Sequence, residues 1–190
     1  TVFDDVFEDW DTDYVQYVYD NGLMTGIKGT KHFAPNANIT KAQVAQVLYN
    51  MENQPAVEDR SVFTELNDVY AAEWYANAVA WAYNEGVATG NSETKRFDVN
   101  TPVKRQQLAA FFYRYAEVMG DDVTVRADYS TMLNADQVSG YAKDAVSWAV
   151  GEGLISGSQK EVNGMKVYDL NPRGNTTRAQ VATILMRFCE

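Results

Sequence analysis

The feature that most constrains this chain is a glycine-bounded pentapeptide that occurs three times. Its copies are Gly22–Gly26, Gly86–Gly90 and Gly153–Gly157, and an aromatic-rich run precedes each of them. Within each run, apolar or aromatic residues recur at positions i, i+4, i+7 and i+8, which places them on one face of a helix. The first glycine suits the end of that helix, where a residue in the left-handed region is common. The sequence therefore predicts three copies of one small helical unit.

A second helix is predicted downstream of each pentapeptide. The segments that begin these helices are Ile39–Gln43, Val103–Gln107 and Thr176–Gln180. In the first and third segments, a threonine three residues before a glutamine has the spacing of a capping box. The middle segment has Lys104 in the place of that threonine, so Thr101–Pro102 is predicted to cap its helix. Six principal helices are therefore expected, beginning near residues 11, 40, 72, 103, 138 and 177.

The fold class that follows is mainly all-α, with three helix-loop-helix units at 1–62, 63–128 and 129–190. The third unit is longer, and its Asn163-Gly164 pair between short apolar stretches predicts a small β-hairpin. A unit of about 60 residues has little core of its own, whereas neighbouring units can share one. We therefore expect the three units to fold as one cooperative module.

The charge balance excludes several kinds of partner. The 190 residues carry 16 Lys and Arg against 26 Asp and Glu, a net charge of −10. Binding to nucleic acid or to anionic lipid needs a basic surface, so neither partner is expected. Apolar runs are too short to span a membrane, and a single cysteine excludes an internal disulfide. No signal-peptide pattern is visible at the start, so the location of the protein must come from other observations.

Residues that could support catalysis or hold a metal are scarce. His32 is the one histidine and Cys189 the one cysteine, and neither recurs among the units. The acidic run Asp9–Asp13 resembles the start of a calcium loop. However, Tyr14 and Asp20 occupy the places where that loop needs glycine and glutamate. We predict no catalytic residue, no metal site and no cofactor.

The order of the motifs resembles that of the S-layer homology (SLH) family, and the resemblance covers nearly the whole chain. It depends on five ordered elements, each found in three copies, and not on any one element alone. In the first unit the elements are Phe3-x-Asp5-Val6, Trp10, Gly22–Gly26, Phe33-x-Pro35 and Ile39–Gln43.

The resemblance implies a three-repeat module with pseudo-threefold symmetry, in which one helix per repeat joins a central bundle and the rest forms three prongs. It implies a noncatalytic module of a secreted bacterial protein, which binds a secondary cell-wall polysaccharide through grooves between repeats and anchors the protein at the cell surface. That polymer is acidic and often carries a ketal-linked pyruvate. A monomeric module is expected.

The same resemblance implies the ligand-binding residues. By position, the basic residues that meet the acidic sugar are Lys41, Arg105 and Arg178. The second glycines of the pentapeptides form turns and would also let a ligand approach the backbone. Acidic residues before the first helices are expected to cap those helices, with a contact to ligand hydroxyls as the alternative. These two sets are Gly26, Gly90 and Gly157, and Asp5, Asp68 and Asp136.

The chemistry of the basic residues agrees with that assignment. A guanidinium can grip a carboxylate with two parallel hydrogen bonds, whereas a lysine offers a point charge. The free N–H groups at a helix start also favour an anion. We therefore predict that Arg178 contributes most to binding, Arg105 next and Lys41 least, and that replacing any of them leaves folding nearly intact. The alternative is that all three are ordinary solvated charges.

Three departures from the family pattern favour unequal sites or a different wall polymer. In the middle segment, Val103–Gln107, little beyond the arginine matches the pattern. Lysine replaces arginine in the first unit, and glutamine replaces glutamate in all three basic segments. Two other functions stay open, namely a protein–protein assembly module and a glycosidase with paired carboxylates. The four tryptophans are predicted to lie in the core, with stacking on sugar rings as the alternative; they are Trp10, Trp74, Trp81 and Trp148.

Overall fold

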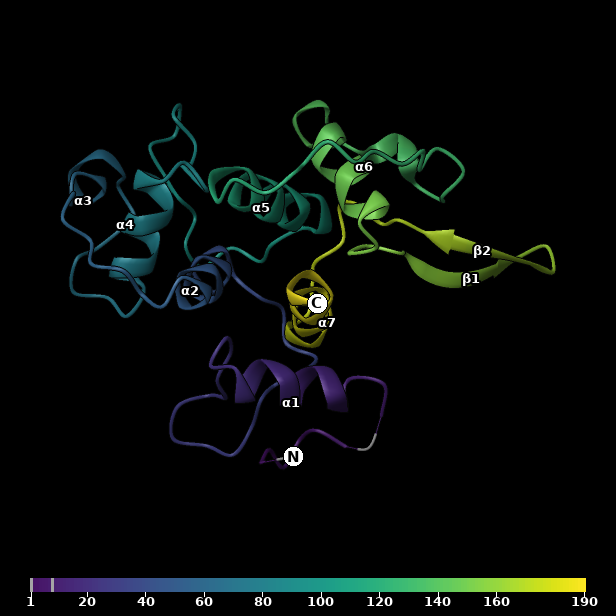
Figure 1. Cartoon of the computed structure of the whole chain (residues 1–190), viewed down its shortest axis with the longest axis horizontal. Helices are drawn as coiled ribbons and strands as arrows, with labels where there is room; N and C mark the ends of the chain where they lie inside the picture. The colour runs from purple at the N-terminus through teal and green to yellow at the C-terminus, as the bar shows by residue number, and fades with distance from the viewer. Residues whose placement is uncertain (1, 8) are drawn as a thin grey trace. The chain divides into compact units, whose positions relative to one another are not determined.

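The protein is mainly helical, as the sequence predicts. The computed structural model describes residues 2–7 and 9–190 (Figure 1). Two short 3₁₀ turns, Ala135–Gln137 and Gly140–Ala142, precede α6. In chain order the described elements are α1 (Thr12–Asp20), α2 (Lys41–Met51), α3 (Val62–Glu65), α4 (Ala76–Asn84), α5 (Arg105–Val118), α6 (Lys143–Gly151), β1 (Ser158–Val162), β2 (Met165–Asp169) and α7 (Arg178–Cys189).

The six predicted helices are all present, and α3 is an additional short helix that the repeat pattern did not predict. The second helices begin within two residues of their predicted starts. The helices α4 and α6 begin four and five residues later than predicted, because turns and the 3₁₀ segments occupy the chain before them. After each first helix, the glycine at 22, 86 or 153 has a positive φ of 66°, 77° or 74°. The three glycines therefore end their helices in the same way.

The capping predictions hold at two of the three second helices. Thr40 and Thr177 each accept a hydrogen bond from the amide of the glutamine three residues later, and that glutamine bonds back. The prediction for the middle helix is wrong, because α5 begins at Arg105 and its N-cap is Lys104. There the Lys104 amide donates to the side chain of Gln107 at 2.9 Å. The preceding Pro102 instead forms an isolated bridge with Thr40.

The predicted β-hairpin is present in the third repeat. Strands β1 and β2 pair antiparallel from Ser158 opposite Asp169 to Val162 opposite Met165. Its tip is Asn163-Gly164, and both residues have positive φ, 53° and 78°. That conformation matches a two-residue turn of the type that Asn-Gly favours. In Figure 1 the hairpin projects away from α6.

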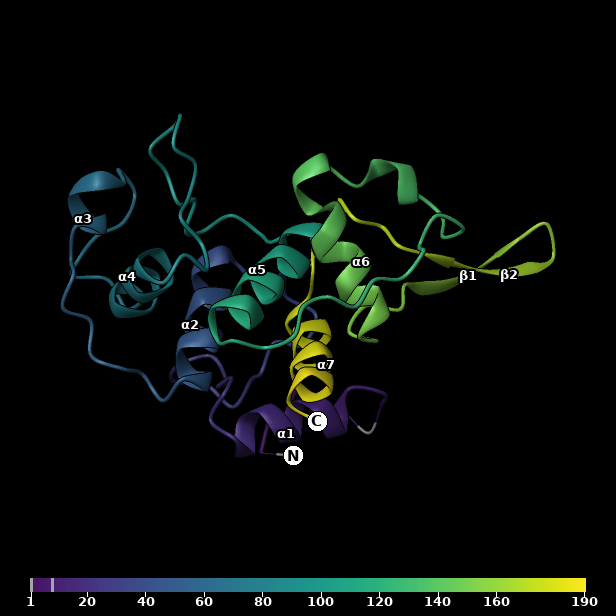
Figure 2. The ribbon, with the colours of Figure 1, turned by 45° about the horizontal axis from the view of Figure 1, so that its top comes forward.

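The chain forms two compact units. The first comprises Thr1–Val103 with Thr177–Glu190, and the second comprises Lys104–Thr176. In the first unit α1 packs against α7, and α2 packs against α4. In the second unit α5 packs against α6 (Figure 2). Each first helix of a repeat therefore packs against a second helix from another repeat, and the sequence repeat is not the packing unit.

The core of each packed pair consists of the apolar faces predicted from the helical spacing. Val15 and Val18 of α1 are fully buried, as are Ala78 and Ala82 of α4 and Leu185 of α7. Among the described residues, no helix is both long enough and apolar enough to cross a membrane.

Candidate functional site

Three similar lobes result from this pairing. Lobe 1 comprises α1, the loop 23–37 and α7. Lobe 2 comprises α4, the loop 87–101 and α2. Lobe 3 comprises α6, the segment 154–174 with its hairpin, and α5. Lobes 1 and 2 belong to the first compact unit and lobe 3 to the second.

In every lobe the start of the second helix docks on the loop by the same two hydrogen bonds. In lobe 1 the amides of Arg178 and Ala179 donate to the carbonyls of Ala37 and Pro35, at 2.9 and 3.0 Å. In lobe 2 the amides of residues 41 and 42 donate to the carbonyls of residues 101 and 99, both at 3.1 Å. In lobe 3 the amides of residues 105 and 106 donate to the carbonyls of residues 174 and 172, both at 2.9 Å.

This docking overturns one expectation from the sequence. The first amides of a helix are free only when nothing else accepts from them. In all three lobes the first two amides already donate to loop carbonyls, and in α2 and α7 the third donates to the capping threonine. The helix starts therefore offer a ligand none of these amides.

The second expectation concerned the acidic residues before the first helices, which were predicted to cap those helices. They do not, because the N-caps of α1, α4 and α6 make no side-chain hydrogen bond. Asp5 instead accepts the amides of Phe33 and Ala34, at 2.7 and 2.8 Å. Burial acts to raise the pKa of Asp5, but these amide hydrogen bonds outweigh it and hold the pKa below its usual value.

In lobe 2, the carboxylate of Asp68 accepts loop amides as that of Asp5 does in lobe 1. It accepts the amides of Phe97 and Asp98 at 2.7 Å each and that of Val99 at 3.3 Å. The side chain of Arg96 lies 3.8 Å from it. The buried Asp68 therefore fixes the turn of the loop that holds the start of α2.

Asp136 was predicted to be the counterpart of Asp5 and Asp68 in the third repeat, and this prediction is wrong. Asp136 is exposed on a 3₁₀ turn. The backbone pairing of Asp4 with Lys31 recurs as Leu133 with Tyr168, which makes Asn134 the counterpart of Asp5. Asn134 donates to the buried Asp169 at 2.8 Å, and Lys160 of β1 lies 2.6 Å from that carboxylate.

The sequence could not reveal this exchange, because the carboxylate of lobe 3 comes from the other side of the loop. Asp169 occupies the position that His32 and Arg96 hold in the other lobes. The hydrogen bonds from Lys160 and then Asn134 lower the pKa of Asp169, against the opposing effect of burial. When the lobes are aligned on the backbone hydrogen bonds of their loops, rather than on their acidic residues, Asp169 is identified as the carboxylate of lobe 3.

The basic residues at the three helix starts lie in unlike surroundings. Arg178 is only 7% exposed. Its guanidinium donates to the carbonyls of Phe33 at 2.8 Å and Thr25 at 2.6 Å, and its carbon Cζ lies 4.8 Å from the centre of the Phe33 ring. Burial lowers the pKa of Arg178, while Asp5 acts in the opposite direction. The expectation of a solvated side chain is therefore wrong for Arg178.

Arg105 and Lys41 are half-buried. Arg105 donates from Nη1 to the carbonyl of Asn171 at 2.9 Å. Burial lowers its pKa, and Asp169 counteracts that effect. Lys41 forms an ion pair of 3.8 Å with Asp98. Each cation is thus engaged by the loop of its own lobe, to a different degree.

The second glycines of the pentapeptides lie where the loop crosses them. A Cβ atom on Gly26, Gly90 or Gly157 would lie 2.7 to 2.9 Å from a loop carbonyl, of residues 32, 96 and 169 respectively. Gly90 and Gly157 also have positive φ, 73° and 77°, whereas Gly26 does not. The close crossing is therefore the property that all three glycines share.

The prediction that all four tryptophans lie in the core is half wrong. Trp81 and Trp148 are buried, as predicted. Trp10 and Trp74 are 56% and 60% exposed, and Tyr141 at the same place in the third repeat is 57% exposed. They lie just before the first helix of each lobe, so every lobe presents one aromatic side chain to solvent.

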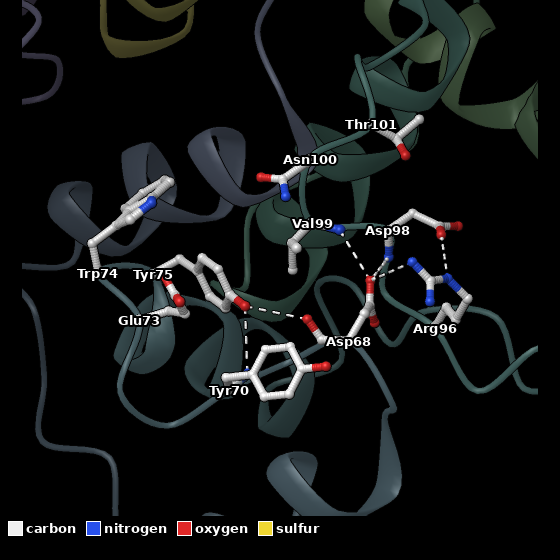
Figure 3. Close-up of a pocket in the computed structure, with 10 residues that line it drawn as sticks. All are labelled: Asp68, Tyr70, Glu73, Trp74, Tyr75, Arg96, Asp98, Val99, Asn100 and Thr101. Carbon is white, nitrogen blue, oxygen red and sulfur yellow. Dashed lines mark hydrogen bonds and ion pairs between the residues drawn. The ribbon is translucent and has the colours of Figure 1, made fainter.

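Lobe 2 contains a half-open pocket of about 370 Å³. Figure 3 shows Arg96 beside Asp68 and Asp98, with Trp74 at the opposite end of the pocket. The other lining residues are Tyr70, Glu73, Tyr75, Val99, Asn100 and Thr101. A more open hollow of about 560 Å³ lies in lobe 1 around Gly26. Among the described residues, no group of three His, Cys, Asp or Glu side chains could hold a metal ion.

Comparison with protein families decides the identity of these repeats. The family model described as S-layer homology domain matches residues 2–45, 65–109 and 135–182, which together make up more than half of the chain. The chain belongs to the S-layer homology family. Its sequence repeats are three tandem S-layer homology domains, and the three lobes are assembled from parts of them.

The chain is similar to parts of several larger proteins. The chain is 25% identical over 188 residues to an amylopullulanase of Thermoanaerobacterium thermosulfurigenes and 23% identical over 188 residues to exoglucanase XynX of Acetivibrio thermocellus. It is 30% identical over 176 residues to the surface-layer 125 kDa protein of Lysinibacillus sphaericus. These matches cover 99%, 99% and 93% of the chain, but only 9%, 16% and 14% of the relatives.

The two acidic positions give a first test of the S-layer homology lobe. Asp68→Ala leaves three loop amides without their acceptor, and each orphaned buried group costs about 1–3 kcal/mol. We expect a loss of about 3 kcal/mol in the free energy of unfolding, measured by urea denaturation. Asp136→Ala is the matched control and should stay within about 0.5 kcal/mol of wild type, because the side chain is exposed. Equal effects of the two substitutions would contradict the role of Asp68 as the acceptor of the three loop amides.

Proposed function

We propose that the chain is a noncatalytic module that anchors a bacterial protein to the cell wall by binding an acidic secondary cell-wall polysaccharide. The observation that carries the proposal is the threefold recurrence of one lobe, in which an exposed aromatic side chain and a basic helix start accompany one docked loop. Membership of the S-layer homology family supports it. A surface-layer protein and carbohydrate-active enzymes among the relatives support a place at the cell surface.

We further propose a monomeric module with pseudo-threefold symmetry, a central helical bundle and three prongs. The support is the cyclic order of the helix pairs, in which repeat one pairs with two, two with three and three with one. The same order is followed by the docking hydrogen bonds. One cooperative unfolding transition is expected from such an arrangement.

The binding residues proposed by position differ in how well the surroundings support them. Arg105 is half-buried and Lys41 faces Asp98, whereas Arg178 is buried against carbonyl groups. We therefore propose Arg105 as the strongest contact to an acidic sugar. The remaining proposed residues act on the loop that shapes the groove; they are Gly26, Gly90, Gly157, Asp5 and Asp68, while Asp136 would contribute only a surface contact.

Cosedimentation with purified cell walls tests the proposal. The chain should sediment with native walls and remain in solution after the secondary polymer has been stripped. Because both partners are acidic, long-range attraction cannot drive binding, so going from low to physiological salt should weaken it only modestly. Arg105→Ala should weaken binding about tenfold, as expected for loss of one charge-assisted hydrogen bond.

The other outcomes identify the competing functions. Equal binding to native and stripped walls, or binding only to another surface protein, would support a protein–protein assembly module instead. Release of sugar from the polymer would support a glycosidase. A steep loss of binding at physiological salt would contradict recognition by local contacts.

A further inference from the structure

The pocket of lobe 2 differs in charge from what an acidic ligand needs. Three carboxylates line it, those of Asp68, Glu73 and Asp98, against the single guanidinium of Arg96. That guanidinium is already engaged, since its Nε lies 3.1 Å from Asp98 and its Nη2 3.8 Å from Asp68. An incoming carboxylate would have to displace Asp98 while facing a net negative lining.

The nearest helix-start cation does not reverse this balance. Lys41 lies 3.8 Å from the other oxygen of Asp98, so the same carboxylate faces both Arg96 and Lys41. Even with Lys41 counted, the carboxylates outnumber the cations. The carboxylate of Asp98 thus already pairs with the two cations, Arg96 and Lys41, that an acidic sugar would otherwise contact here.

Asp98 also distinguishes lobe 2 from the other lobes. The loop position that it holds is Ala34 in lobe 1 and Asn171 in lobe 3, and all three residues have positive φ. Neither alanine nor asparagine carries a charge. The backbone of the position is therefore common to the three lobes, while the negative charge there belongs to lobe 2.

The rest of the pocket suits an uncharged sugar ring. Tyr70 and Trp74 line it and are each 60% exposed, so they present flat apolar surfaces to solvent. Such surfaces pack well against the C–H face of a sugar. The carboxylates accept hydrogen bonds from hydroxyl groups, and Arg96, Asn100 and Thr101 can donate to ring substituents. The volume of about 370 Å³ lies in the range of small-molecule sites.

We propose that the pocket of lobe 2 binds a neutral, hydroxyl-bearing sugar residue of the wall polymer and discriminates against an acidic one, with Trp74 as the stacking platform and Asp98 as the residue that sets the charge preference. This inference rests on the proposed function, because it assigns one residue type of the polymer to one lobe.

The test uses two probes that differ only in a charged group, added to the intact 190-residue chain. They are the methyl glycoside of N-acetylglucosamine and the same glycoside with pyruvate ketal-linked through its O4 and O6 hydroxyl oxygens. The indole N–H signal of Trp74 is followed by NMR. The neutral probe should shift this signal at a concentration at least fivefold lower than the acidic probe.

Two variants and a control make the result specific. Trp74→Ala should abolish the response of the Tyr70 amide to the neutral probe, whereas Tyr141→Ala, the matched change in lobe 3, should leave it unaltered. Asp98→Asn should tighten binding of the acidic probe at least fivefold relative to that of the neutral probe. Both exposed aromatic changes should leave the thermal melt close to wild type, which separates binding from folding.

The outcomes separate this inference from the proposed function. If the chain sediments with native walls but both probes shift Trp74 equally, and Asp98→Asn changes nothing, the charge preference is wrong and the wall-binding function stands. If Trp74 responds to the neutral probe as expected but the chain ignores walls, the pocket is a sugar site and the anchoring function is wrong. Wall binding with no response of Trp74 to either probe would also overturn the inference.

Discussion

Replacing Arg178 by alanine should lower the free energy of unfolding by about 3 kcal/mol. The substitution leaves the buried carbonyl of Phe33 and the part-buried carbonyl of Thr25 without their donor, and an orphaned buried group costs about 1–3 kcal/mol. It also removes the cation from the face of the Phe33 ring. For a chain of this length, such a loss corresponds to a melting temperature lower by roughly 6–12 °C.

Lys41→Ala is the matched control, because Lys41 holds the same position in lobe 2. Its ion pair with Asp98 is partly exposed, and such pairs contribute about 0–1 kcal/mol. The melting temperature of this variant should therefore fall by no more than about 4 °C. If the two variants melt together near wild type, Arg178 is not the clamp described for lobe 1. Arg178→Lys should fall between them, because lysine keeps the charge but cannot reproduce the planar two-carbonyl contact.

Arg178 also shows where reading the sequence succeeds and where it stops. The position of this residue at the start of α7 followed from the capping box and the helical spacing. Its burial did not, because the groups that cover it, Phe33 and Thr25, are about 150 residues away in the chain. Spacing arguments describe one element at a time, so they predicted the helices, the glycine turns and the Asn-Gly hairpin but not which helix packs against which.

The candidate site shows the same limit. Residue type alone paired Asp136 with Asp5 and Asp68, whereas the backbone of lobe 3 places Asn134 there and moves the carboxylate to Asp169. Trp74 at helical spacing was predicted to be buried, but it precedes the first turn of α4 and remains exposed. Both errors arise at the ends of elements, where periodicity carries no information about burial.

The exchange of helices between repeats leads to the prediction with the largest effect, that an excised sequence repeat will not fold. A fragment of residues 1–62 contains α1 and α2 but neither of the helices on which they pack, α7 and α4. It would expose apolar faces that are buried in the intact chain, including those of Val15 and Leu48. Its far-ultraviolet circular dichroism should be that of a largely unfolded chain, with no cooperative melt.

A fragment of residues 104–176 is the control, since it is similar in length and contains a complete helix pair. It comprises the second compact unit, with α5 packed on α6 and the start of α5 docked on its own loop at Pro172 and Gly174. This fragment should retain helical signal and a melting transition, because the contacts that form its core lie within it. Helix stability in proteins comes mainly from the packing of an apolar face, so a fragment folds only if it contains the helix on which that face packs. A folded 1–62 fragment together with an unfolded 104–176 fragment would therefore show that the sequence repeat is the packing unit.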